Sequence, residues 1–357
     1  MTSKDLTIVS VLHSSKLNGV SMQNYLFNQT MESKDKHCIS PTRDNQDVID
    51  SFESIGCNFH IVPEIRQTEF IRSLNPDILL VESLFSVRGL NNVNAPKKLL
   101  RVHEEVNLSD SDELWDRDIV DKNKLKDFDD YTWIFPCVET MNYYDEYLNR
   151  LDIDASVIPG TTEEEHLPST STDRFSVLQI GTLYERKGAL KTLEAFKKLV
   201  SNGVDGELIL VGARRSTKRE HKYEKKVKKK VRENELNERV EIHPATQDKM
   251  RYFAQADVAT LHSKSESFPT VLLEALYAGK PIVASNVGGV QSMITSQEGF
   301  LFDYGDVQAQ YKALCRIHNN LDTWKQAEED ISQFYQQNYS KQQYRNRFKE
   351  VIKANNG

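Results

Sequence analysis

The stretch ESFPTVLLEALYAGKP, residues 266–281, decides the interpretation of this chain. Its two glutamates, Glu266 and Glu274, have seven mostly apolar residues between them. Eight helical positions make a little over two turns, so two carboxylates at this spacing point roughly the same way on one helix. Because proline is favoured at the first helical position, Pro269 predicts a helix entry within residues 267–271. An apolar, buried helix would then carry one carboxylate at its entry and another inside it, and each needs a partner.

The entry of such a helix is suited to an anion. The first backbone N–H groups of a helix have no partner within it, and the positive end of the helix dipole lies there. A diphosphate would therefore bind beside Thr270 and Val271. The carboxylates could accept hydroxyl groups of the same ligand, since each takes two hydrogen bonds at once. The alternative is structural, with Glu266 as the helix cap and Glu274 paired with a lysine or an arginine.

Length and composition indicate a globular protein with two domains. The chain has 357 residues, of which 38% are apolar and 28% charged, and this length exceeds one ordinary core. Its longest apolar runs are strand-length, so we expect no membrane-spanning helix and no signal peptide. Four scattered cysteines without a C-x-x-C pair predict free thiols rather than disulfides or a zinc site. We therefore expect a cytoplasmic protein.

Strand-like and helix-like segments alternate twice along the chain, which predicts parallel sheets covered on both faces. The Ser-, Thr- and Glu-rich segment 161–173 predicts a linker. We expect an N-terminal domain at 1–160, a C-terminal domain at 174–335, and a helical segment at 336–357 that packs back on the first domain. Two doubly wound, Rossmann-like domains would face each other across a crevice at the carboxyl ends of their strands.

Three segments, VLQIGTLYERKG, LILVG and ADVATLHSKSESFPTVLLEALYAGKPIVASNVGG, carry a resemblance. In order and spacing they resemble the nucleotide-sugar-binding domain of retaining GT-B glycosyltransferases of family 4, the glycosyl transferases group 1. The resemblance is dense from residue 175 to about residue 289 and weaker in the first domain. It implies the α/β GT-B fold and transfer of a sugar from a nucleoside-diphosphate sugar, with a UDP-sugar expected first. It also implies an acceptor hydroxyl in a glycan, glycolipid or cell-surface polymer, with no cofactor and no metal.

The resemblance assigns roles in the second domain. Glu266 would hold hydroxyls of the sugar and Glu274 those of the ribose. Lys187, with Arg186 beside it, follows the strand VLQIG and can neutralise the leaving diphosphate; two exposed surface cations are the alternative. Retention would follow from attack on the same face of the sugar, with the leaving phosphate taking the proton of the acceptor. The helix entry that completes the donor site comprises Phe268, Thr270 and Val271.

Other candidates lie on loops after strands. His103 follows the strand LLRV, and the resemblance brings it to the donor sugar from the first domain, although a structural role is common for a lone histidine. Asn18 and Gly19 follow the first strand, where glycine lets the backbone approach a phosphate or sugar. His262, just upstream of Glu266, could touch the donor or be structural.

The chain departs from the family pattern at two places. Thr182 stands where arginine usually follows the first glycine, and Gln291 and Ser292 replace the acid that commonly follows the glycine pair Gly288 and Gly289. These departures leave open a binding or scaffold subunit that has kept the fold and lost catalysis. A nucleotide-sugar epimerase, which needs no acceptor, is the alternative enzyme.

Charge is distributed unevenly. The net charge is −7; residues 1–160 hold 16 basic and 27 acidic side chains, and the remainder holds 30 and 26. Eleven residues from Arg214 to Arg232 are basic, and Tyr223, Val227 and Val231 form an apolar stripe beneath them. This segment predicts either a solvated helix or a surface for anionic lipid at the inner face of the membrane. Nucleic acid is a less favoured acceptor because the first domain is acidic. Its acidic segment 104–130 lacks the glycine turn of a calcium loop, so we expect no metal site.

Overall fold

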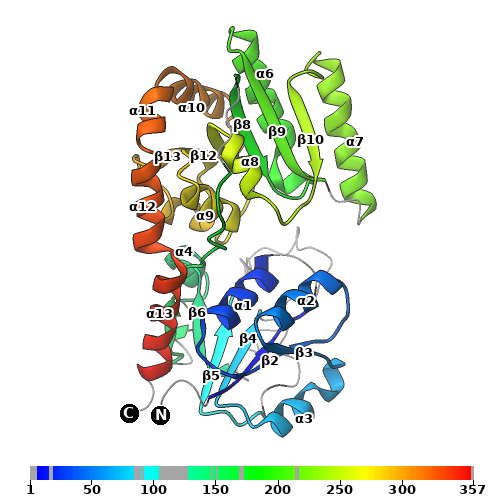
Figure 1. The fold of residues 1–357 in the computed structure, drawn as a ribbon, viewed down its shortest axis with the longest axis vertical. Helices are drawn as coiled ribbons and strands as arrows, with labels where there is room; N and C mark the ends of the chain where they lie inside the picture. The colour runs from blue at the N-terminus through cyan, green and yellow to red at the C-terminus, as the bar shows by residue number, and fades with distance from the viewer. Residues whose placement is uncertain are drawn as a thin grey trace. The chain divides into compact units, whose positions relative to one another are not determined.

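The computed structural model describes residues 6–15, 19–83, 90, 92–103, 128–145, 148–149, 152–168, 173–213 and 217–354. The chain forms two compact units. The first comprises Met1–Thr161 together with Lys341–Gly357, and the second comprises Thr162–Ser340. Each unit is built around its own sheet (Figure 1).

The sheet of the first unit has the strand order β3-β2-β1-β4-β5-β6-β7. Every neighbouring pair is parallel, and β4 and β6 are buried along their whole length. The strands are β1 (Thr7–Val11), β2 (Asp35–Ser40), β3 (Cys57–Ile61), β4 (Ile78–Glu82), β5 (Lys97–Arg101), β6 (Thr132–Phe135) and β7 (Ala155–Val157).

Helices from both ends of the sequence cover this sheet. The helices are α1 (Gly19–Thr30), α2 (Gln46–Ser54), α3 (Glu64–Leu74), α4 (Val138–Asn142) and α13 (Lys341–Ala354). The last helix, α13, packs beside α1, where the ring centroids of Phe27 and Phe348 are 4.9 Å apart. Tyr344 and Phe348 are buried in one cluster with Ile8 and Leu80 of the sheet. The C-terminal helix is therefore part of the core of the first unit.

The sheet of the second unit is also parallel, in the order β10-β9-β8-β11-β12-β13. Its strands are β8 (Phe175–Ile180), β9 (Gly206–Ala213), β10 (Val240–Pro244), β11 (Val258–Leu261), β12 (Ile282–Ser285) and β13 (Gly299–Phe302). Its helices are α6 (Ala189–Ser201), α7 (Lys218–Glu233), α8 (Met250–Gln255), α9 (Thr270–Tyr277), α10 (Val307–Asn319), α11 (Leu321–Gln326) and α12 (Glu328–Asn338), with the 3-10 turns η3 (Glu185–Lys187) and η4 (Gly288–Ser292).

The strand order of each sheet reverses beside its first strand. β1 lies between β2 and β4, and β8 lies between β9 and β11. At such a switch point the connections leave neighbouring strands toward opposite faces, which makes room for a ligand at the carboxyl ends. The candidate residues of the second unit follow β8 and β11, the two strands at this switch point. The topology therefore places the candidate residues where ligands bind in this class of sheet.

The stretch at residues 266–281 differs from the expectation of one helical face. Helix α9 begins at Thr270, with Pro269 as its N-cap residue and no side-chain hydrogen bond at the cap among the described residues. Glu266 therefore precedes the helix, and it neither caps α9 nor shares a helical face with Glu274. The interruption follows from the Phe-Pro pair, because the residue before a proline is driven away from the helical conformation.

Two predictions from composition can be compared with the structure. The four cysteines are free thiols, as expected, and three of them are buried. Within the described ranges, no helix has both the length and the apolar character needed to cross a bilayer.

Candidate active site

The loop after β8 packs tightly against the loop after β11. Gly188 follows η3 in the left-handed conformation, with φ of 66°. A Cβ atom placed on it would lie 2.0 Å from the carbonyl oxygen of His262, so only glycine fits there. The backbone N–H of Lys264 also donates to the carbonyl of Arg186 at 2.8 Å. These contacts hold residues 186–188 against residues 262–266.

Glu266 lies between two cations in this pair of loops. The ammonium of Lys187 donates to Oε1 of Glu266, and the Nη1 atom of Arg186 lies 3.9 Å from Oε2. Arg186 is held by the hydroxyl of Tyr184 at 2.7 Å and by the carbonyl of Ser265. The predicted grouping of Glu266, Lys187 and Arg186 is thus present within the second unit.

Glu266, Lys187 and Arg186 interact strongly because Glu266 and Lys187 are largely shielded from water. The side chains of Glu266 and Lys187 are 8% and 17% exposed. Burial lowers the pKa of Lys187; Glu266 opposes this effect, Arg186 adds to it, and the pKa lies below its ordinary value. Two neighbouring cations with little water need an anion, and Glu266 supplies it. A diphosphate carries the same sign of charge and could take its place.

Glu274 is buried within α9 and pairs with a different lysine. The ammonium of Lys249, the residue before α8, donates to its Oε1. Its Oε2 atom is buried and has no hydrogen-bond partner in the described part of the chain. A buried carboxylate oxygen without a donor is unfavourable. A ligand hydroxyl at this atom would remove that cost.

The residues at the start of α9 differ in their exposure to solvent. Thr270 and Val271 are the first two residues of α9 and are partly exposed. The ring of Phe268 packs edge-on against Tyr339, with centroids 5.9 Å apart, so it contributes to the core. The predicted contacts of these residues with a donor stay predictions. The glycine pair Gly288 and Gly289 begins the 3-10 turn η4, and the N–H of Gly289 donates to the carbonyl of Ser267 at 3.0 Å.

The contacts of His262 favour its structural alternative, and its predicted contact with the donor stays a prediction. His262 is fully buried; its Nδ1–H donates to Oε1 of Gln310 at 2.7 Å, and its Nε2 accepts from the N–H of Gly305 at 3.1 Å. Burial lowers the pKa of His262 to about 4, although the hydrogen bond to Gln310 opposes this shift. Both nitrogens are therefore used inside the protein, and His262 has a structural role.

The predicted loop residues of the first unit are only partly described. Asn18 lies outside the described residues, and so does the acidic segment 104–127. Gly19 is the first residue of α1, and a Cβ atom there would meet no protein atom within 4 Å among the described residues. The described residues therefore leave room for a side chain at this position, and the predicted approach of a ligand to Gly19 stays a prediction.

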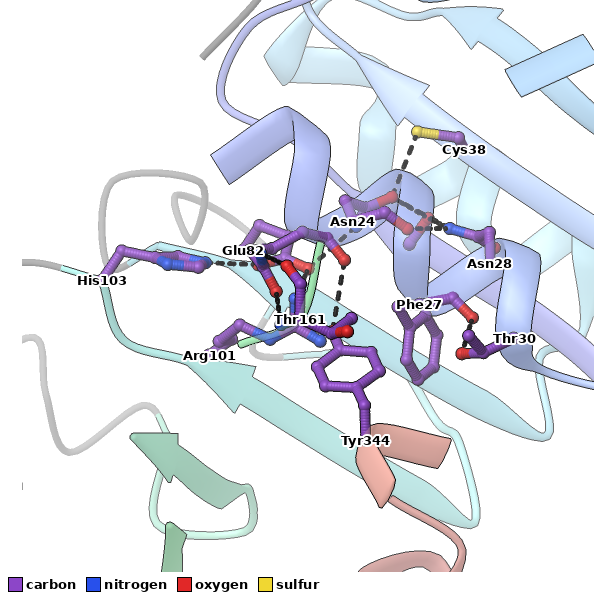
Figure 2. Close-up of polar contacts among 12 residues, drawn as sticks. Asn24, Phe27, Asn28, Thr30, Cys38, Glu82, Arg101, His103, Thr161 and Tyr344 are labelled. Carbon is purple, nitrogen blue, oxygen red and sulfur yellow. Dashed lines mark hydrogen bonds and ion pairs between the residues drawn. The ribbon is translucent and has the colours of Figure 1, made fainter. Parts of the chain in front are cut away.

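His103 belongs to a buried polar cluster in the first unit (Figure 2). Its Nε2 atom lies 2.7 Å from Oε2 of Glu82, which is fully buried at the end of β4. Asn24 donates to Oε1 of Glu82 at 3.0 Å, and the Nη1 atom of Arg101 also lies 3.0 Å from that oxygen. Burial opposes the charge on Glu82, but Arg101, His103 and Asn24 outweigh it, so the pKa of this carboxyl lies below its ordinary value. The sequence prediction missed Glu82, although one acid at the end of the buried strand DILLVE was a usable signal.

The sequence of this chain is similar to a known protein family and to individual glycosyltransferases. The family described as glycosyl transferases group 1 matches residues 161–340. A glycosyltransferase of Haemophilus influenzae described as uncharacterized is 28% identical over 153 residues, which cover 42% of this chain and 41% of the relative. The capsular polysaccharide biosynthesis glycosyltransferase CapM of Staphylococcus aureus is 22% identical over 173 residues, covering 48% and 44%. The matched part thus spans less than half the length of either relative.

A solved structure resembles the chain over almost its full length. The complex of Anabaena Alr3699/HepE with UDP and glucose superposes with a TM-score of 0.80, at 14% identity, over 97% of this chain and 99% of that one. At this identity the likeness concerns the fold alone. It confirms the predicted α/β class and the GT-B fold.

Proposed function

The chain belongs to the glycosyl transferases group 1, and on this premise we propose that it transfers a sugar from a nucleoside-diphosphate sugar to an acceptor hydroxyl with retention of configuration. The observation that carries the proposal is the grouping of Lys187, Arg186 and Glu266 beside the entry of α9, at the switch point of the second sheet. Cations and a helix N-terminus at one place suit a diphosphate, and a carboxylate among them suits sugar hydroxyls.

The proposed donor site extends along α9. The diphosphate would replace Glu266 as the partner of Lys187, and Glu266 would then accept hydrogen bonds from the sugar. The buried Oε2 atom of Glu274, which has no hydrogen-bond partner within the described ranges, would accept a ribose hydroxyl. His103 would hydrogen-bond a hydroxyl of the sugar, as the resemblance implies.

The proposed reaction breaks the bond between the anomeric carbon and the β-phosphate oxygen. Negative charge grows on that phosphate, where Lys187, Arg186 and the N–H groups at Thr270 and Val271 would stabilise it. The acceptor oxygen attacks the anomeric carbon on the face that the phosphate leaves, and its proton passes to the departing phosphate. The products are the α- or β-linked glycoside matching the donor, and a nucleoside diphosphate.

The substrate classes are part of the proposal. The structure of Alr3699/HepE contains UDP and glucose. CapM is named as a glycosyltransferase of capsular polysaccharide biosynthesis. We therefore favour a UDP-sugar donor and an acceptor in a glycan, glycolipid or cell-surface polymer. We also propose that the protein acts in the cytoplasm and that transfer needs no metal ion. Transfer assays with and without EDTA test the second of these proposals.

A thermal-shift screen against UDP-, GDP-, ADP- and dTDP-sugars tests the donor proposal. A ligand that binds only the folded protein raises its melting temperature, so one of these sugars should give a clear shift. A shift with no transfer to any acceptor would favour the scaffold interpretation, which Thr182 and Gln291 keep open. NMR of the product tests retention, since an inverted anomeric centre would exclude the proposed mechanism.

A second proposal concerns the exposed face of α7. Tyr223, Val227 and Val231 anchor the helix in the core of the second unit, and Thr217 and Glu220 form a capping box at its start. The lysines on the opposite side are exposed and spaced by four, three and four residues, which aligns them along one line. This line comprises Lys218, Lys222, Lys225 and Lys229. We propose that it binds anionic lipid, because phosphate headgroups match an aligned row of ammonium groups.

Vesicle sedimentation tests this contact. The wild type should bind phosphatidylcholine vesicles only when phosphatidylglycerol is added, and salt should weaken the binding. Replacing Lys222, Lys225 and Lys229 with glutamine should reduce binding by about 100-fold, since each lysine near an anionic surface contributes about 1 kcal/mol. The matched control replaces three exposed lysines that lie outside α7, Lys34, Lys312 and Lys325. Equal losses in both variants would contradict the proposal.

A further inference from the structure

The side chain of Glu82 is held in one position by neighbours from two other elements. It ends β4, and its Cα partner in the parallel register with β5 is Arg101. Oε1 receives the amide of Asn24 from α1 and lies beside the guanidinium of Arg101, while Oε2 faces His103. Each oxygen of this buried carboxylate therefore has its own partners.

The orientation of the Asn24 amide follows from its other contacts. Its oxygen accepts from the hydroxyl of Ser10 at 3.0 Å and from the amide of Asn28 at 2.9 Å. The NH₂ group must then face Glu82, which can only accept when ionised. Asn24 is thus a fixed donor to Oε1.

Arg101 is equally constrained. Its side chain is 5% exposed. The guanidinium lies 4.9 Å from the ring centroid of Phe348 and 5.7 Å from that of Tyr344, both on α13, and 5.8 Å from that of Phe27 on α1. A cation packed among three rings cannot swing toward His103 without losing these contacts. Oε1 of Glu82 therefore keeps two positively polarised neighbours, and Oε2 remains directed at the histidine (Figure 2).

This geometry determines the tautomer of His103. An ionised carboxylate has no proton to give, so the hydrogen bond at 2.7 Å requires that Nε2 of His103 carries the hydrogen. In the neutral ring, Nδ1 is then the nitrogen with the lone pair. We propose that Glu82 is a positioning residue of the transfer reaction, which fixes both the orientation and the Nε2–H tautomer of His103. This inference rests on the proposed function, in which His103 contacts the donor sugar.

The variant Glu82→Gln gives a sharp test because the amide of Asn24 and the positive charge of Arg101, both beside Oε1, decide how the new amide turns. Asn24 and Arg101 will hold the carbonyl oxygen of the substituted side chain at the place that Oε1 occupies in the wild type. The NH₂ group then faces His103 and donates to Nε2, which must become the acceptor. The expected result is an inverted tautomer with hydrogen on Nδ1, seen in the ¹⁵N NMR shifts of the ring nitrogens in histidine-labelled protein. The signals of His103 are assigned by comparison with His103→Gln.

The kinetic expectation accompanies the spectroscopic one. Transfer by Glu82→Gln should show kcat reduced at least about tenfold, with the KM for the donor changed by less than about threefold. A second variant, Glu82→Gln with Arg101→Met, removes the buried cation together with the carboxylate and covers the case in which the single variant folds poorly. Asn24 alone then holds the amide carbonyl, and the same inversion is expected.

The outcomes separate this inference from the proposed function. If the NMR spectra of wild type and variant show the same tautomer of His103, Glu82 does not set it and the inference is wrong. If the tautomer inverts and kcat is unchanged, the positioning has no role in transfer and the inference also fails. If the wild type transfers no sugar from any donor but the tautomer inverts as expected, the proposed function fails while the structural assignment of Glu82 holds.

Discussion

Glu82 and Glu266 occupy similar places in the two units and are held in different ways. Each lies at or after the carboxyl end of a strand beside the switch point of its sheet, and each faces two basic side chains. Glu82 has no exposed surface and hydrogen-bonds through both oxygens. Glu266 is bonded through one oxygen, and the Arg186 guanidinium lies 3.9 Å from the other.

The difference separates a closed polar network from an exchangeable ion pair. A buried carboxylate that is bonded through both oxygens is costly to disturb and keeps one geometry. An ion pair at the start of a helix, in which one of the two contacts is as long as 3.9 Å, can exchange its partner at lower cost. The first arrangement suits a residue that holds another, and the second suits a residue that a ligand displaces.

The largest expected effect comes from Glu266→Gln. Transfer should fall by about 1,000-fold, because the carboxylate no longer binds the sugar in the transition state. UDP without a sugar should bind about threefold more tightly, because Lys187 is no longer neutralised by the protein. Calorimetry with UDP and a transfer assay measure the two effects, with Glu328→Gln as the control. Transfer at the wild-type rate would remove Glu266 from the site.

Lys187→Met should weaken UDP binding by about 100-fold, through loss of one charge-assisted contact to the diphosphate. Lys280 provides a matched control, since it is buried in the same unit and pairs with Glu328 at 2.7 Å. Lys280→Met should leave UDP affinity unchanged. Equal losses in both variants would mean that Lys187 acts through stability rather than through the ligand.

The next prediction concerns the buried hydrogen bonds that His262 makes to Gln310 and Gly305 in the second unit. Its pKa is about 4 in the folded protein against an ordinary value of 6.5, so the unfolded chain binds more protons between these values. Stability contributed by the neutral ring is therefore present above about pH 6.5 and is lost as the pH falls toward 4. Between pH 7 and pH 5 this loss is about 2 kcal/mol.

Urea unfolding of wild type and His262→Asn at both pH values measures this contribution. The variant should be less stable at pH 7, since it loses contacts to Gln310 and Gly305, but its stability should fall less between pH 7 and pH 5. Parallel pH dependences for the two proteins would show that His262 titrates normally and that the network is open.

The smallest effect is expected for Glu274→Gln, which should reduce the affinity for UDP about tenfold by weakening one ribose contact. The corresponding 2′-deoxynucleotide distinguishes this contact from a structural effect. If Glu274 holds the ribose hydroxyls, the variant should lose less affinity for dUDP, which keeps only the 3′-hydroxyl, than for UDP. A tenfold loss with dUDP as well would assign Glu274 to packing with Lys249.

Part of this site could be predicted because strands, turns and helices follow one another regularly along the sequence. Lys187, Arg186 and Glu266 follow strands within a recurrent strand, turn and helix pattern, so their residue types and spacing point to the switch point. The role of Glu82 depends on the register of β4 against β5, which brings it to Arg101 nineteen positions later in the chain. The burial of His262 depends on Gly305 and Gln310, more than forty positions away. Such contacts leave no periodicity in the sequence.

The placement of α13 affects how the protein is made. Its fourteen residues, Lys341–Ala354, belong to the first unit although the whole second unit precedes them in the chain. During synthesis the second unit can fold while the first still lacks the aromatic rings that surround Arg101 and cover Ile8. The first unit is therefore completed after the second. An interruption of translation after residue 340 would release a protein whose second unit is intact and whose first unit has an open apolar face.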